Sequence, residues 1–346
     1  MAFRKLSWTI SAASSAAVAI GYMRYRREMS AIEAGLDAAS RIADTSVGPL
    51  EYGELGEGEP LLIVHGAGGG YDQGLLLGRE LGGNFRLIAP SRFGYLRTPV
   101  PEDSSPTAQA EAHVALLDYL GLAKVIVAAA SAGAPSAIEL TLRHPDRVSA
   151  LILLVPRAYH PDCPAQADES MQSQAVLRAV QGSANFAMWL AMRLSRPAVV
   201  RFLGVPPQVE AKAPIAERER VTQIMKSLLP LSRRVRGILV DGAARILPLP
   251  LERISRPVLI FSAEDDLYRT LPGAKLAAQH IAGSELHVLP TGGHLMVGQM
   301  ATVRRVIASF LKRHHVRERT LKSTRSQSIG ARRVERGRGQ RLQAIL

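Results

Sequence analysis

Residues 125–136 read VIVAAASAGAPS, an apolar run that gives way to the smallest side chains around a single serine. A strand that reverses directly into a helix forces its turn residue into strained backbone angles, so the flanking residues must be small to avoid collision. The segment Ala129–Gly133 has only alanine and glycine around Ser131. It therefore predicts a strand, a tight turn and a helix, with the Ser131 hydroxyl exposed as a nucleophile beside backbone N–H groups that stabilise negative charge.

A serine hydroxyl is a weak nucleophile without a base, so a histidine and an orienting carboxylate are required elsewhere in the chain. The apolar run 257–263 is followed by Asp265 and Asp266, and the run 285–290 is followed by a Thr-Gly-Gly turn and His294. Both loops are expected at the carboxyl ends of strands, where α/β sheets carry their chemistry. The order serine, acid, histidine fits a nucleophile, an orienting acid and a base, with either aspartate as the acid.

Short apolar runs rich in valine, isoleucine and leucine alternate with helical stretches along the chain. The runs are residues 60–66, 85–90, 124–130, 148–156, 257–263 and 285–290, and helical stretches lie at 108–122 and 136–143. This repetition predicts an α/β fold with a mostly parallel sheet flanked by helices. Residues 31–156 and 255–311 are expected to form this core. Residues 157–254 lack a convincing strand and are expected to form an inserted helical cap.

Four short motifs stand in order along the chain. A glycine-rich loop that begins with histidine lies at His65–Gly70, and an Arg-x-Gly segment, SRFGYLRTP, at residues 91–99. The serine turn at Ala129–Gly133 is followed by RHPDRV at residues 143–148. In this arrangement the chain resembles the α/β-hydrolase fold family over residues 49–312, with alanine in place of the first glycine of the family's G-x-S-x-G.

The resemblance implies a sheet of about eight strands and a catalytic triad of Ser131, Asp266 and His294. The family's acid usually ends a G-x-x-D pattern, and Ala263–Asp266 fits this pattern with alanine in place of glycine. The resemblance therefore favours Asp266 over Asp265 as the acid.

By the same resemblance, the backbone N–H groups of Ala67 and Ala132 are expected to form an oxyanion hole. His65, Gly66 and Gly133 are expected to support the loops that carry these groups. His65 is interpreted as a structural residue that anchors the glycine loop and takes no proton during the reaction.

Together these residues predict a serine hydrolase that cleaves a carboxylic ester, or a related acyl bond, of a small-molecule substrate through an acyl-enzyme. A C–C bond hydrolase with the same triad and a non-catalytic binding protein of the same fold are the alternatives. No cofactor and no metal are expected. The single cysteine, Cys163, excludes an intrachain disulfide and a cysteine-based zinc or iron–sulfur site. The run HGAGGG lacks the pattern of a nucleotide-binding loop.

The formal net charge of +13 is confined to the two ends of the chain. Residues 1–28 carry +4 and residues 312–346 carry +9, so the body between them is neutral. The basic tail over 312–346 mixes like charges with Gly, Ser and Gln and is expected to be disordered. A solubilising role or contact with anionic lipid headgroups is favoured for it, and nucleic-acid binding is not expected.

The N-terminal segment contains an uncharged run from Leu6 to Met23, between Arg4–Lys5 and a second basic cluster that starts at Arg24. Eighteen residues reach the lower limit of what spans a bilayer, roughly 18 or more. Residues 1–30 are therefore interpreted as a single-pass membrane anchor. The alternative is a signal segment cleaved near Ala17–Ala19, which would make the protein secreted or periplasmic.

Overall fold

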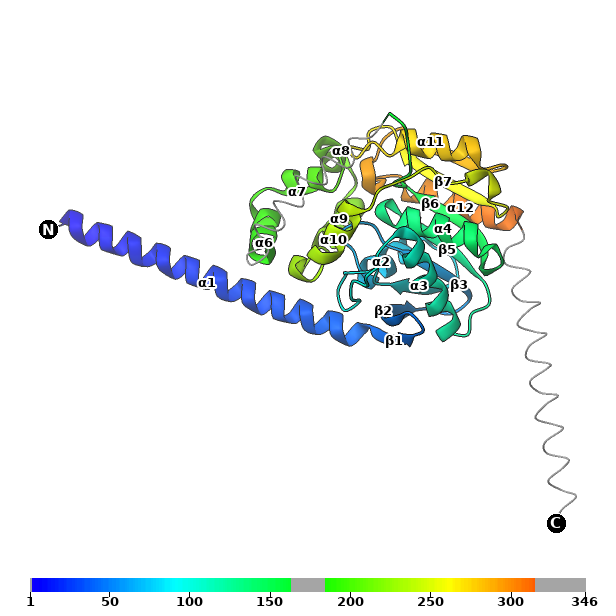
Figure 1. Ribbon diagram of the computed structural model, residues 1–346. Helices are drawn as coiled ribbons and strands as arrows, with labels where there is room; N and C mark the ends of the chain where they lie inside the picture. Colours follow the sequence, from blue (N-terminus) through cyan, green and yellow to red (C-terminus); the bar gives the residue numbers. More distant parts are fainter. Residues whose placement is uncertain (1, 163–183, 315–346) are drawn as a thin grey trace, which may run out of the picture.

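The computed structural model describes residues 2–162 and 184–314, with the backbone alone for residues 2–18. The described residues form one eight-stranded sheet in the order β1-β2-β4-β3-β5-β6-β7-β8 (Figure 1). Its strands are β1 (Arg41–Thr45), β2 (Gly48–Leu55), β3 (Glu59–Val64), β4 (Phe85–Pro90), β5 (Val125–Ala130), β6 (Val148–Leu154), β7 (Val258–Ala263) and β8 (Glu285–Leu289). The expectation of about eight strands is confirmed.

The sheet is parallel except at one edge. Strands β4, β3, β5, β6, β7 and β8 pair in parallel, whereas β2 pairs antiparallel with β4, and β1 antiparallel with β2. The central strands β3, β5, β6 and β7 are buried along nearly their whole length. Strands covered on both faces read as continuous apolar runs, and these are the runs visible in the sequence. The prediction of a mostly parallel sheet is confirmed.

Helices cover both faces of the sheet. One face packs on α3 (Pro106–Tyr119), α4 (Ala134–Arg143) and α11 (Leu271–His280). The other face packs on α2 (Tyr71–Leu81) and α12 (Met300–Arg313). Because successive side chains of a strand point to opposite faces, alternate residues of each central strand divide between the two hydrophobic clusters.

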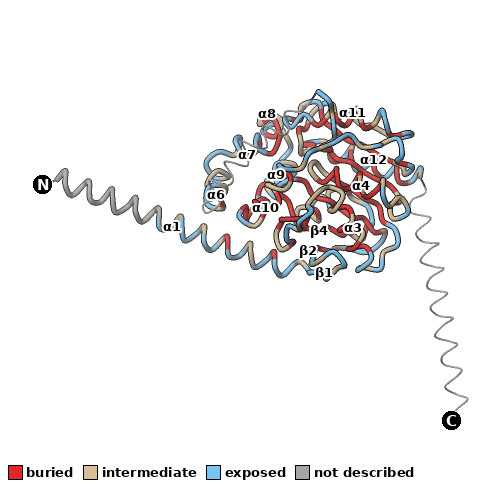
Figure 2. The backbone as a smooth tube through the Cα atoms, in the orientation of Figure 1, coloured by how far each residue is buried: buried red, intermediate tan, exposed pale blue. Residues whose placement is uncertain are grey.

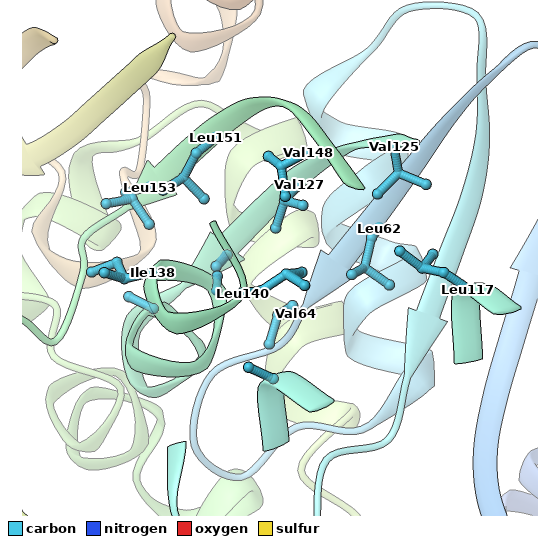
Figure 3. Close-up of a cluster of buried hydrophobic side chains, with 14 of the residues drawn as sticks. Leu62, Val64, Leu117, Val125, Val127, Ile138, Leu140, Val148, Leu151 and Leu153 are labelled. Atoms are coloured by element: carbon cyan, nitrogen blue, oxygen red, sulfur yellow. The ribbon is translucent and has the colours of Figure 1, made fainter. Parts of the chain in front are cut away.

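Figure 3 illustrates the first of these clusters. Leu62 and Val64 of β3 lie beside Val127 of β5, and the cluster also contains Leu117 of α3 and Ile138 of α4. Burial on this scale stabilises the sheet by about 25 cal/mol for each Å² of apolar surface removed from water. This core fixes where each strand ends, and therefore where the loops at the carboxyl edge begin.

A group of helices lies between β6 and β7, as expected for a cap. These cap helices are α6 (Ala184–Leu194), α7 (Arg196–Phe202), α8 (Pro207–Lys212), α9 (Ile215–Lys226) and α10 (Val235–Ala243). In Figure 1 they stand beside the sheet, with α9 and α10 nearest to it. The boundaries 157–254 remain a prediction, because residues 163–183, which include Cys163, lie outside the described residues.

The basic tail begins within the last helix. Helix α12 ends at Arg313, and residues 315–346 lie outside the described residues. The predictions of disorder, lipid contact and absence of nucleic-acid binding for residues 312–346 therefore stay predictions.

The prediction of a membrane anchor over residues 1–30 is wrong. The first helix, α1 (Ala2–Ala39), has 38 residues, but no helix in the described part of the chain is both long and apolar enough to cross a membrane. More than half of residues 6–23 are alanine, serine or threonine. Freedom from charge does not by itself make a run hydrophobic, and a membrane span also needs strongly apolar side chains.

The C-terminal half of α1 packs against the folded body instead. Met29 is buried against Trp189 of α6, and Leu36 against Tyr71 of α2. The Trp189 indole N–H and the Arg193 guanidinium both donate hydrogen bonds to Glu28, at 2.8 and 2.7 Å. Figure 2 shows the buried positions of α1 only where the helix runs along the body. Helix α1 therefore contacts both the cap helices and the core.

Replacement of Met29 tests this docking. We expect Met29→Ala to lower the free energy of unfolding by about 2–3 kcal/mol, because it removes a buried side chain and leaves a cavity. The matched control is Met23→Ala on the same helix, where the side chain is 61% exposed and the expected change is within about 0.5 kcal/mol. Urea denaturation followed by Trp fluorescence measures both. Equal stability of the two variants would contradict the packing of α1.

Candidate active site

Ser131 occupies a strained turn between β5 and α4. Its φ is +49°, in the left-handed region that residues with a Cβ rarely adopt. A Cβ on Gly66 would lie 3.1 Å from the Ser131 Cβ, and one on Gly133 would lie 2.7 Å from the carbonyl oxygens of Val64 and His65. The turn therefore requires small residues both beside the serine and across from it, as its sequence indicated.

Asp266 and His294 form a hydrogen-bonded pair beyond the carboxyl ends of β7 and β8. The distance between His294 Nδ1 and Asp266 Oδ2 is 2.9 Å. Thr270 donates to the same carboxylate oxygen at 2.5 Å, and the backbone N–H of Tyr268 donates to Oδ1 at 2.9 Å. Asp266 is only 5% exposed.

The pair keeps the Asp266 carboxylate ionised. Burial acts to raise the pKa of Asp266, but the charge of His294 and the hydrogen bonds from His294, Thr270 and the Tyr268 N–H outweigh it. The pKa of Asp266 therefore lies below its ordinary value. An ionised carboxylate at Nδ1 fixes the ring so that Nε2 is the nitrogen available as a base.

The neighbouring Asp265 has a different set of partners. Its carboxylate accepts hydrogen bonds from the Thr291 hydroxyl at 2.6 Å and from the backbone N–H groups of Gly292 and Gly293 at 3.2 and 2.8 Å. These residues immediately precede His294. Asp265 thus holds the loop that carries the histidine, whereas Asp266 contacts the histidine itself.

Ser131 is not hydrogen-bonded to His294. Among the described residues, the Ser131 hydroxyl has no hydrogen-bond partner, and the backbone carbonyl of Ser131 accepts from the N–H of Arg157 at 3.0 Å. Catalytic hydrogen bonds are often long or poorly aligned without substrate and tighten when it binds. The structure therefore brings Asp266 and His294 together, and leaves the half-buried serine as a separate group at the same edge of the sheet.

The glycine loop after β3 lies against the serine turn, and the buried His65 side chain holds this loop by hydrogen bonds. The His65 Nδ1 donates to the Gly66 carbonyl at 2.7 Å, and Nε2 accepts from the Arg92 backbone N–H at 3.0 Å. Burial, followed by the Arg92 guanidinium, lowers the pKa of His65 well below its usual value. A neutral ring satisfies both contacts, so His65 serves as a fixed support.

Ala67 is exposed at the tip of this loop, and Ala132 follows the serine in the first turn of a short helix, Ser131–Gly133. Backbone N–H groups in a first helical turn have no acceptor within the helix. The Ala67 N–H also has no backbone acceptor among the described residues. Both groups are therefore available to a ligand.

Sequence reasoning missed the side chains that tie the glycine loop to the cap helices. Arg92 forms a bidentate ion pair with Asp241 of α10, at 2.6 and 2.7 Å. The Tyr95 hydroxyl donates to Asp241 and accepts from the Gly68 N–H at 3.2 Å. Burial and the Asp241 carboxylate raise the pKa of Tyr95 well above its usual value. The segment SRFGYLRTP signalled one half of this network, but no local pattern identified Asp241.

A second cap residue, Arg234, is fully buried at the glycine loop. Its guanidinium donates to the Gly69 carbonyl at 2.5 Å and forms an ion pair with Asp72 of α2 at 2.9 Å. An unpaired buried charge would cost several kcal/mol, so Asp72 is needed to neutralise it. The buried Arg234 of the cap and the Asp72 carboxylate of the core thus hold the loop after β3 in place.

Two cavities lie near the site, and neither is lined by Ser131 or His294. One of about 30 Å³ is lined by Arg92, Ala132, Arg157 and Asp241, among others. The other, of about 680 Å³, lies between α4, α11 and the chain after β6. The described residues contain no cluster of three or more His, Cys, Asp or Glu side chains placed to hold a metal ion. Cavity shape therefore does not define the substrate.

Comparison with known proteins gives the family. A family model described as alpha/beta hydrolase fold matches residues 59–299. An uncharacterized hydrolase of Bacillus subtilis is 28% identical over 259 residues, which are 72% of this chain and 89% of that protein. A 2-hydroxymuconate semialdehyde hydrolase of a Pseudomonas species is 26% identical over 266 residues, 75% of this chain and 88% of that protein.

The solved structures agree with this result. An alpha/beta hydrolase fold protein from Nakamurella multipartita has a TM-score of 0.60 and 30% sequence identity, over 79% of this chain and 98% of that one. The region matched by the family model, residues 59–299, contains the serine turn and the loops of Asp266 and His294, and it leaves out α1. On the strength of the family match and of the sheet that carries these loops, the chain belongs to the alpha/beta hydrolase fold family.

Proposed function

We propose that this hydrolase cleaves a small-molecule carboxylic ester through a triad of Ser131, His294 and Asp266. One observation carries the proposal: the buried Asp266 carboxylate binds Nδ1 of His294, at the sheet edge where Ser131 stands in a strained turn. A carboxylate, an imidazole and an alcohol in this order form the group of side chains that acyl transfer requires. Membership of an alpha/beta hydrolase family supports hydrolysis as the reaction.

In the proposed mechanism, Nε2 of His294 takes the proton of Ser131 as the serine oxygen attacks the substrate carbonyl. Asp266 holds the imidazole in the required tautomer and stabilises the imidazolium that forms. The backbone N–H groups of Ala67 and Ala132 donate to the oxyanion. The alcohol leaves with the proton from His294, and a water activated by the same histidine then hydrolyses the acyl-enzyme.

A second candidate function is hydrolysis of a carbon–carbon bond with the same triad. This candidate is kept because the matched Pseudomonas protein is named a 2-hydroxymuconate semialdehyde hydrolase. Both reactions need a base, an oxyanion hole and a nucleophile or an activated water. The ester is preferred here because its leaving group is an alkoxide, which His294 can protonate directly, whereas cleavage of a C–C bond expels a carbon leaving group that must be protonated at carbon.

Labelling of the serine tests the chemistry. We expect a fluorophosphonate probe to label the wild-type protein, and Ser131→Ala to abolish labelling and to lower kcat for an ester on the order of 10⁴-fold or more, because the nucleophile is lost. Ser104→Ala is the control and keeps both properties. A wild-type protein that neither reacts with the probe nor hydrolyses esters would favour the non-catalytic binding protein.

Two asparagine variants separate the adjacent carboxylates. We expect Asp266→Asn to lower kcat on the order of 10⁴-fold, because an amide at Nδ1 selects the wrong tautomer of His294. Asp265→Asn keeps an oxygen acceptor for the Thr291 hydroxyl, and we expect its kcat to stay within about tenfold of wild type. Steady-state kinetics on one ester measures both. A larger loss in Asp265→Asn than in Asp266→Asn would contradict the assignment of the acid.

A substrate series separates ester from C–C bond hydrolysis. We expect kcat/KM for p-nitrophenyl esters from acetate to decanoate to exceed that for 2-hydroxymuconate semialdehyde by at least about tenfold. The reason is that p-nitrophenolate is a good leaving group, and lowering the activation free energy by about 1.4 kcal/mol raises the rate tenfold. Release of p-nitrophenol and loss of the semialdehyde absorbance are measured on the same preparation. A higher kcat/KM for the semialdehyde would replace the ester proposal with the second candidate.

A further inference from the structure

The loop that carries His294 contains a strained residue just after the histidine. Met296 has a φ of +51°, which a residue with a Cβ rarely adopts, whereas the positive φ of Gly292, Gly293 and Gly298 suits glycine. Strained backbone of this kind persists only where its surroundings hold it in place. Asp265 of the core holds the first part of the loop through Thr291, Gly292 and Gly293. The part after His294 must be held by something else.

The cap helix α9 provides the contacts to that second part. Arg220 donates from Nη2 to the Leu295 carbonyl at 2.9 Å, and from Nε and Nη2 to Glu217 at 3.1 and 3.0 Å. Glu217 in turn accepts the backbone N–H of Gly298 at 2.9 Å. Arg220 and Glu217 thus bind the loop at the Leu295 carbonyl and at the Gly298 N–H, on either side of Met296. Arg220 is 8% exposed, so its own contacts are largely shielded from water, whereas the hydrogen bond between Glu217 and Gly298 lies at the surface.

We propose that Arg220 and Glu217 are positioning residues that hold His294 against Asp266, an inference that rests on the proposed function. Neither residue contacts His294 or the serine. They act through the backbone of Leu295 and Gly298, which lie one and four residues after the histidine. The cap helices then help to orient His294, the proposed base, in addition to covering the sheet edge.

The turn between α7 and α8 supports the same loop from a second side. The Gly204 carbonyl accepts the backbone N–H of His294 at 3.0 Å and that of Leu267 at 3.1 Å. One cap carbonyl therefore joins the loop of the base to the loop of the acid. A Cβ on Gly204 would lie 2.6 Å from the His294 Cβ and 2.6 Å from the Tyr268 ring, so the approach is close.

Apolar packing completes the attachment. Val297 is 2% exposed and lies in one hydrophobic cluster with Val205, Val221 of α9 and Leu228, and Leu295 packs against the edge of this cluster. Removal of the Arg220–Glu217 contacts is therefore expected to loosen the loop without unfolding the protein. The groups that contact the His294 side chain are Asp266, by hydrogen bond, and Tyr268, by ring contact at 4.7 Å.

The test uses the full chain with the double substitution Glu217→Gln and Arg220→Met, which removes both charges and leaves no unpaired ion in the cluster. Arg218→Gln is the matched control, because Arg218 lies on the same helix with a side chain that is 48% exposed. Fluorophosphonate titration counts competent sites, and kcat, KM and the pH profile of kcat/KM are measured per site on a p-nitrophenyl ester.

We expect kcat of the double variant to fall about 10- to 100-fold, because small displacements of a catalytic group cost rates of this size, while KM stays within about twofold. The pH profile of kcat/KM changes as well, because the contact between His294 and Asp266 on which proton transfer depends is loosened. Arg218→Gln matches wild type in all three readouts. Glu217→Gln alone keeps an oxygen acceptor for the Gly298 N–H and shows a smaller loss of kcat in the same direction.

The inference is overturned if the double variant has the same kcat per titrated site and the same pH profile as wild type. This holds even if its melting temperature falls, because Arg220 and Glu217 would then only stabilise the fold. If the double variant does not fold, Glu217→Gln decides by the same two readouts. If wild type and Ser131→Ala hydrolyse the ester equally fast, the proposed function is overturned instead. The two failures are therefore distinct.

Discussion

The geometry of the site depends on the left-handed backbone at Ser131. The chain reverses there from the centre of the sheet into α4, and the reversal is possible only because Gly66 and Gly133 leave room for it. A larger residue at either position would meet the serine or the carbonyl oxygens of β3 and the residue after it. Because β3 and β5 are neighbours, the same constraint draws the glycine loop against the serine. The placement of the glycine loop beside the serine follows from this contact.

Much of this arrangement could be predicted from local sequence because its causes are local. Buried parallel strands must be apolar on both faces, which made six of them visible, and the serine turn must be built from small residues. The antiparallel edge strands β1 and β2 had no such signal, since they are short or only partly buried. Asp265 and Asp266 follow the same strand, and although the family's G-x-x-D pattern favoured Asp266, their different hydrogen-bond partners appeared only in three dimensions.

The contacts between cap and core could not be predicted, because their partners are far apart in the sequence. Arg92 and Asp241 are 149 residues apart, and nothing near Asp241 indicates a buried carboxylate. Arg220 and Arg234 read as ordinary surface charges on helices until their burial is known. The error at the N-terminus had a different origin. A run without charges satisfied the length of a membrane span, but alanine and serine gave it too little hydrophobicity.

Helix α1 gives the cap a second attachment that is independent of the chain connections at β6 and β7. Glu28 holds α6 through Trp189 and Arg193, while Leu36 of the same helix accepts a hydrogen bond from the Tyr71 hydroxyl of the core at 2.6 Å. A swinging motion of the cap as one rigid lid would break one of these two sets of contacts. Helix α1 therefore couples the position of α6 to that of the core.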